Sequence, residues 1–102
     1  MTYLPPEKRI NPAQLRQMFN DGDYWARAQA GEFRVEVMTE KHPAPERSGQ
    51  PLCTLSQFLA YFDKQGQEIA RVHQYLRPDQ KLGGSGQPDP KRLFINGIIY
   101  KI

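Results

Sequence analysis

Four side chains with complementary chemistry alternate along the C-terminal third of the chain: Arg71, His73, Tyr75 and Arg77. On a β-strand such odd-numbered residues share one face, here over about 20 Å at about 3.3 Å per residue. Histidine can transfer a proton near neutral pH, and arginine can stabilise charge that develops on a phosphate. Tyrosine can stack on a nucleic-acid base. The spacing therefore predicts a surface that contacts RNA.

Two interpretations of this strand stay open. In one, the protein is a metal-independent ribonuclease whose catalytic residues are His73, Arg71 and Arg77, with His73 as the general acid and base. In the other, the strand presents an ordinary mixed sheet face, partly covered by N-terminal helices, on which His73 is hydrogen-bonded to Gln57. A single histidine on a strand does not separate the two, and we favour binding over catalysis.

A glycine-rich turn, Gly83–Gly86, lies in a polar loop that we expect to span residues 77–91. Consecutive glycines let backbone N–H groups point at an anion. The turn is not a Walker loop, because no Gly-Lys-Ser/Thr follows it. A flexible solubilising loop is the plainer interpretation, although loops of this length are often functional. If the loop folds back on the sheet, its cations and His73 converge on one phosphate. The predicted phosphate or nucleic-acid contacts are Arg77, Lys81, Gly84, Ser85, Lys91, Arg92 and Tyr75.

The sequence gives little support for a disulfide, a metal site or a cysteine nucleophile. Cys53 is the only cysteine, so an internal disulfide and a cysteine-based zinc site within one chain are excluded. We expect it to be a small buried apolar residue and not a nucleophile. Trp25 and Tyr24 are predicted to anchor the core. We expect no metal and no cofactor, because the possible metal ligands have no recognised spacing; they are His42, His73, Asp79 and Asp89.

The charge is unevenly distributed. Residues 1–51 carry seven basic and seven acidic side chains, whereas residues 52–102 carry seven and four, which gives the whole net charge of +3. A basic field in one half favours an anionic partner such as RNA or another polyanion. A charge of +3 is also ordinary for a small soluble domain.

The first third is predicted to be helical. Asn11-Pro12 is a typical helix start, because asparagine caps the free N–H groups and proline suits the first helical position. A second short helix is expected over residues 23–30 and a strand over residues 33–38, where apolar residues alternate.

Two strands, residues 55–62 and 68–76, are predicted to form a hairpin. Residues 63–66 suit a type I turn with Gly66 in the left-handed region. This turn would pair Phe58 with Val72 and Ala60 with Ala70 on the core face. The other face would then hold Tyr61 with Arg71, His73 and Tyr75, and its expected pairs are Tyr61–Ile69, Leu59–Arg71, Gln57–His73 and Leu55–Tyr75.

The chain ends with a second hairpin, in which Asn96-Gly97 joins the apolar runs 93–95 and 98–100. The expected fold is α+β, with short N-terminal helices packed on an antiparallel sheet of about four or five strands. The expected organisation is one domain, residues 1–102, whose parts are an extended arm (1–10), a helical region (11–31) and a sheet region (32–102) with long loops at 42–54 and 77–91. The last strand, residues 98–102, is apolar, and we expect it to lie at an edge of the sheet, where it could pair with a second copy to form a homodimer.

No apolar stretch suggests a membrane span or a signal peptide, so we expect a cytoplasmic protein without a membrane partner. The leading interpretation is a small basic RNA-binding protein that uses the sheet face and the Gly/Pro-rich loop. The alternatives are the ribonuclease described above and a module that binds a protein partner, a role common among small bacterial-type proteins.

Overall fold

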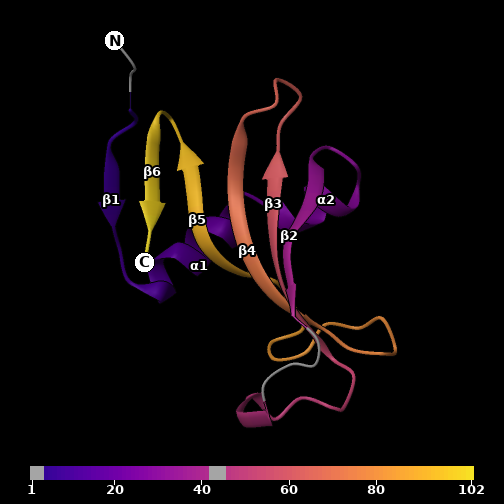
Figure 1. Cartoon of the computed structure of the whole chain (residues 1–102). Coiled ribbons are helices and arrows are strands. Elements are labelled where there is room, and N and C mark those ends of the chain that lie inside the picture. Colours follow the sequence, from indigo (N-terminus) through magenta and orange to yellow (C-terminus); the bar gives the residue numbers. More distant parts are fainter. Residues whose placement is uncertain (1–3, 42–45) are drawn as a thin grey trace.

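The computed structural model describes residues 4–41 and 46–102, which form a sheet of six strands and two helices (Figure 1). The elements are β1 (Glu7–Arg9), α1 (Pro12–Asp21), α2 (Tyr24–Gln29), β2 (Arg34–Lys41), the 3-10 turn η1 (Glu46–Ser48), β3 (Leu55–Phe62), β4 (Glu68–Leu76), β5 (Asp89–Ile95) and β6 (Ile98–Lys101). The predicted α+β class is confirmed, with six strands in place of four or five. Predictions on residues 1–3 and on residues 42–45, including His42, lie outside the described residues.

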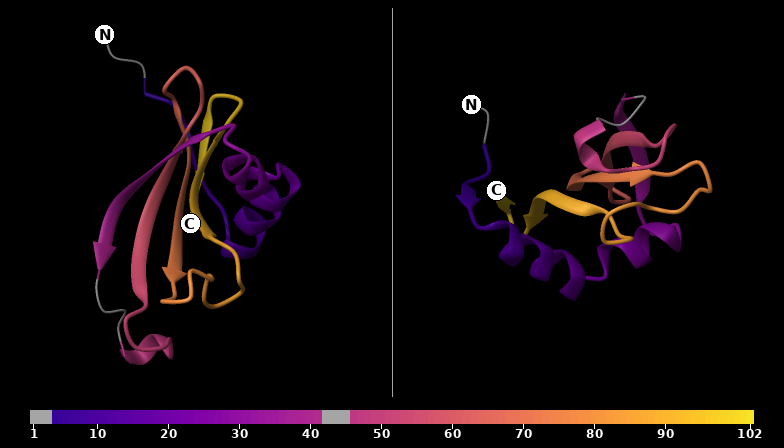
Figure 2. Two further views of the ribbon diagram at one scale, coloured as in Figure 1. Left: turned by 90° about the vertical axis from the view of Figure 1, so that its right-hand side faces the viewer. Right: turned by 90° about the horizontal axis from the view of Figure 1, so that it is seen from below.

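The helix α1 begins as predicted. Asn11 Oδ1 accepts a hydrogen bond from the Gln14 backbone N–H, and the Gln14 side chain accepts one from the Asn11 N–H. This reciprocal cap satisfies N–H groups that have no partner within the helix. The helix buries Leu15 and Phe19, which are 0% and 1% exposed, against the sheet. Both helices cover the same face of the sheet, as the side view shows (Figure 2).

The β3–β4 hairpin has the predicted strand bounds and turn. Gly66 has φ +80°, its N–H donates to the Asp63 carbonyl, and Asp63 Oδ1 accepts from the N–H groups of Gln65 and Gln67. Asn96 and Gly97 also form the predicted tight turn, with φ +51° and +79° between β5 and β6. Such positive φ values are those that a type I′ turn requires.

The predicted pairing of this hairpin is wrong by one residue. A bulge lies where Tyr61 pairs with Ala70 and the next residue, Phe62, pairs with Glu68. Ile69 is the extra residue, so Phe58 lies opposite His73 instead of Val72. The remaining pairs shift in the same way and are Leu55–Leu76, Ser56–Tyr75, Gln57–Gln74, Leu59–Val72 and Ala60–Arg71.

The shift exchanges the two faces of β3. Leu59 and Tyr61, not Phe58, pack with Ala70 and Val72 in the core cluster beneath the helices. Ala60 is 0% exposed but lies on the other side of β3, across from Arg71. Tyr61 is only 3% exposed, and its burial raises the pKa of the phenol to about 12. The prediction that Tyr61 shares a face with Arg71, His73 and Tyr75 is therefore wrong.

The N-terminal arm contributes a strand that was not predicted. β1 pairs in parallel with β6, and the Lys101 Nζ lies 2.6 Å from the Glu7 carboxylate. The prediction that the last strand is an edge is wrong, because β6 lies between β1 and β5. Within the described part of the chain the sheet ends at β1 and β2, so a homodimer through β6 lacks the free edge it would need.

The loop after β4 is shorter than expected, since β5 already begins at Asp89. Pro90 is tolerated near the start of this strand, beside a bulge in the β4–β5 pairing, where proline costs no regular ladder bond. Cys53 is exposed with φ +67°, which corrects the expectation of a buried cysteine. No helix within residues 4–41 and 46–102 is long and apolar enough to cross a bilayer.

Candidate nucleic-acid interface

The sheet face opposite α1 and α2 carries three of the side chains singled out from the sequence. Arg71, His73 and Tyr75 alternate along β4 with Ala70 and Val72, which belong to the core. Successive strand residues point to opposite sides, so the three lie on the side that the helices leave uncovered (Figure 2). We call this side the open face; its members on the central strands are Ser56, Phe58, Arg71, His73, Tyr75, Arg92 and Phe94.

His73 occupies the centre of the open face. Its Nε2 and the Ser56 Oγ share a hydrogen bond of 2.8 Å. The imidazole centroid lies 4.9 Å from the Phe58 ring and 4.8 Å from the Tyr75 ring, with Tyr75 in an edge-on arrangement. The predicted bond to Gln57 is wrong, because the bulge turns Gln57 to the helix side of the sheet.

The environment of His73 favours its neutral form. Burial lowers the pKa of the imidazole, and the nearby Lys91 ammonium lowers it further, while the Asp89 carboxylate partly offsets both. At neutral pH the ring therefore accepts a proton less readily than a free histidine. A neutral ring can act as a base or stack against another ring, but it adds no positive charge.

Arg71 is held beside His73 by an ion pair. Its Nε and Nη2 donate to the two Glu68 oxygens at 2.8 and 3.0 Å. This two-point contact uses two of the five guanidinium N–H groups, which leaves three for an anionic ligand. Arg92 lies directly across from Arg71 on β5. The two guanidinium groups thus sit on neighbouring strands of one face, one of them in a fixed orientation.

Two phenylalanines that were not predicted as site residues also lie on the open face. Phe58 faces His73 across the β3–β4 pair, and Phe94 lines a small hollow with Arg92 and Ile99. The Phe58 position could be found only with the correct register, since the predicted register placed it in the core. Phe94 follows the buried Leu93, so strand alternation alone would have located it.

Of the predicted loop cations, Lys91 lies near His73, whereas Arg77 and Lys81 are placed elsewhere. Arg77 Nε donates to the Gln50 side chain at 3.1 Å, and the Gly83 N–H donates to the Tyr75 carbonyl. Lys81 lines a hollow with Trp25, which belongs to α2 and therefore lies on the helix side of the sheet. The predicted phosphate cluster is thus divided between two sides of the molecule.

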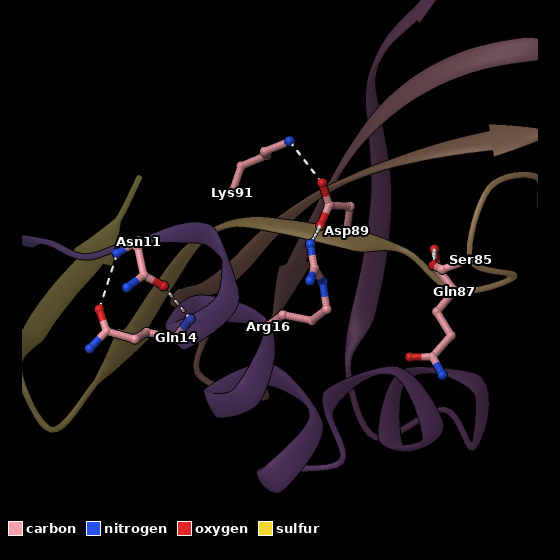
Figure 3. Close-up of polar contacts among 7 residues, drawn as sticks. All are labelled: Asn11, Gln14, Arg16, Ser85, Gln87, Asp89 and Lys91. Carbon is pink, nitrogen blue, oxygen red and sulfur yellow. Dashed lines mark hydrogen bonds and ion pairs between the residues drawn. The ribbon is translucent and has the colours of Figure 1, made fainter.

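The other loop positions are exposed or occupied by protein groups. Gly84 and Ser85 are exposed, and Ser85 Oγ donates to the Gln87 carbonyl at 3.4 Å. Lys91 Nζ lies 2.9 Å from one Asp89 oxygen, and an Arg16 guanidinium nitrogen lies 3.7 Å from the other (Figure 3). Asp89 thereby ties the start of β5 to α1, a contact that no local spacing in the sequence could indicate.

The described residues of the open face present neither a metal cluster nor an accessible serine nucleophile. Among residues 4–41 and 46–102, no group of three or more His, Cys, Asp or Glu side chains is arranged to hold a metal ion. Ser56 is hydrogen-bonded to His73, but it is only 8% exposed, so a substrate could not reach its hydroxyl without rearrangement. The accessible chemistry of the open face is that of rings and guanidinium groups.

Three comparisons with known proteins found no match. No protein-family model matches the chain, and neither a curated protein nor a solved structure does.

Proposed function

We propose that the protein binds single-stranded RNA on the open face. The observation that supports this most is a sheet face without helical cover on which the rings of Phe58, His73 and Tyr75 lie beside Arg71 and Arg92. Bases of a single strand can stack on such rings, and each stacked base contributes about 1–3 kcal/mol. The paired bases of a duplex are not available for this contact.

The charges of the open face suit the backbone of the same strand. Arg71 retains free donors beside its contact with Glu68, and Arg92 lies across from it. Binding phosphates releases counterions, so affinity should fall as salt rises. Because the pKa of His73 is lowered, the imidazole gains its charge only below neutral pH, and acidification should strengthen the interaction.

RNA cleavage is the second candidate, and His73 is the observation that favours it. A neutral imidazole beside a guanidinium group can remove a proton from a ribose hydroxyl. Cleavage also needs an acid for the leaving oxygen, and the part of the chain that the structure describes holds one histidine, His73. Binding requires no second proton carrier, which is why we place it first.

The test uses a labelled single-stranded RNA of mixed sequence in EDTA, with binding read by fluorescence anisotropy and cleavage by gel. We expect binding without cleavage and a steep dependence on salt. The Arg71→Gln, Arg92→Gln double variant should reduce the slope of log affinity against log salt by about 2, one for each phosphate contact. Tyr75→Leu should weaken binding by about 5- to 100-fold through lost stacking.

The matched control is Lys8→Gln, which removes one positive charge from β1 on the side where α1 lies. The Lys8→Gln substitution should alter neither the stacking of bases on the rings nor the charges of the open face. Equal losses for Lys8→Gln and the arginine variants would mean a nonspecific charge effect and would overturn the proposal. Absence of RNA binding at low salt would overturn it as well. Cleavage in EDTA that disappears in His73→Ala would favour the ribonuclease.

A further inference from the structure

A hollow of about 530 Å³ lies on the helix side of the sheet, between α2 and the loop that follows β4. Trp25 and Gln29 of α2 form one wall, Gln80 and Lys81 of the loop form another, and Gln74 of β4 also lines it. Small-molecule sites typically enclose about 300–1,000 Å³. The open face is on the other side of the sheet, so this site does not depend on the proposed RNA binding.

A chain of hydrogen bonds fixes the Gln74 carboxamide. Gln57 Nε2 donates to the Glu40 carboxylate at 3.0 Å, and Gln74 Nε2 donates to Gln57 Oε1 at 2.9 Å. A carboxylate only accepts, so it sets the orientation of Gln57, which in turn sets that of Gln74. Gln57, in the middle of this chain, is 5% exposed, whereas Glu40 lies at its exposed end. Gln74 therefore keeps its Oε1 acceptor and one N–H donor for another molecule.

These two groups match the edge of adenine. A glutamine carboxamide can accept from adenine N6 and donate to N7 at once. Guanine presents two acceptors at the same edge, so its O6 would meet the Gln74 oxygen without a proton between them. The orientation imposed by Glu40 through Gln57 would therefore suit adenine better than guanine.

The other walls suit the rest of a nucleotide. The half-buried Trp25 ring offers a surface on which a base can stack. Lys81 is exposed at the loop, where its ammonium can contact a phosphate as a point charge. We propose that the hollow binds an adenine nucleotide, with the base between Trp25 and Gln74 and the phosphate at Lys81.

Trp25 provides a direct readout, because it is the only tryptophan in the chain. Titration with AMP should quench its fluorescence saturably, and GMP should bind more weakly by about 5- to 100-fold. Gln74→Leu should weaken AMP binding by a similar factor and abolish the preference over GMP. Lys81→Ala should weaken binding of AMP and leave that of adenosine unchanged.

Two matched controls lie on the β3–β4 turn, away from the hollow. Gln65→Leu and Lys64→Ala make the same chemical changes at exposed positions and should leave AMP binding unaltered. Quenching by AMP identifies a free nucleotide as the ligand, whereas quenching by an adenine oligonucleotide alone identifies an adenine within a strand. The Arg71→Gln, Arg92→Gln variant should retain AMP binding even if its RNA binding is lost.

The proposal is overturned if neither AMP nor the oligonucleotide quenches Trp25 saturably, or if GMP and AMP bind equally well to the unaltered protein. Unchanged AMP binding by a folded Gln74→Leu variant would also overturn it. Circular dichroism establishes whether that variant folds. If it does not, the comparison of AMP with GMP and the effect of Lys81→Ala decide the question.

Discussion

The assignment of the two sheet faces can be tested by comparing two neighbouring residues of β3. Leu59 is 7% exposed in the core, whereas Phe58 is half-buried on the open face beside His73. Leu59→Ala removes three carbons, each with about 0.8 kcal/mol of burial free energy, or about 2.4 kcal/mol in all. The cavity that remains raises the loss to about 3–4 kcal/mol. Phe58→Ala should cost about 1.5 kcal/mol or less, since its ring is partly exposed to water in the folded state.

Urea unfolding measures both losses. With a slope of about 1–3 kcal/mol per molar urea, a loss of 3 kcal/mol lowers the midpoint by about 1–3 M. The smaller loss for Phe58→Ala should lower it by about half as much or less. The register without the bulge would place Phe58 in the core opposite Val72. A larger loss for Phe58→Ala than for Leu59→Ala, at unchanged slopes, would therefore refute the assignment of the faces.

Three further predictions concern the cap, His73 and Tyr61. Asn11→Ala should lower the free energy of unfolding by about 1 kcal/mol, because the first turn of α1 loses its side-chain acceptor. Asn11→Asp keeps an acceptor and should therefore retain most of the stability that the cap contributes, as measured in the same thermal melt. The pKa of His73 is lowered in the folded protein, so the unfolded chain binds the proton more readily, and the free energy of unfolding should fall as pH drops through 6.5. His73→Gln should reduce the dependence of the urea midpoint on pH in this range. An equally steep dependence in the variant would show that His73 is not its cause. Tyr61 should ionise near pH 12 in an ultraviolet titration, and a step near pH 12 that persists in Tyr61→Phe would show that another group causes it.

Much of the local structure could be predicted because it depends on neighbouring residues. Asn11-Pro12 specifies a helix start through its own side-chain chemistry, and Asn96-Gly97 specifies a tight turn through its positive φ values. The strands on either side of Gly66 could be located with the same bounds that the structure has. Alternation along β4 was sufficient to group Arg71, His73 and Tyr75.

Features that depend on distant residues could not be predicted. The bulge at Ile69 places Tyr61 and Ala70 opposite each other in the core, and it decides whether His73 meets Gln57 or Ser56. The short strand β1 is stabilised by pairing with β6, at the other end of the chain. The chain of hydrogen bonds through Gln57 likewise requires three strands in register, which no single segment of sequence specifies.

The proposed RNA surface is tested most directly by nuclear magnetic resonance of the labelled protein during titration with a single-stranded RNA. We expect the ring signals of Phe58, His73 and Tyr75 to shift together, because these side chains share the open face. The signals of Leu15 and Phe19, buried on the helix side, should stay in place. Shifts confined to the helix side, or no shift at RNA concentrations that saturate binding, would contradict the account.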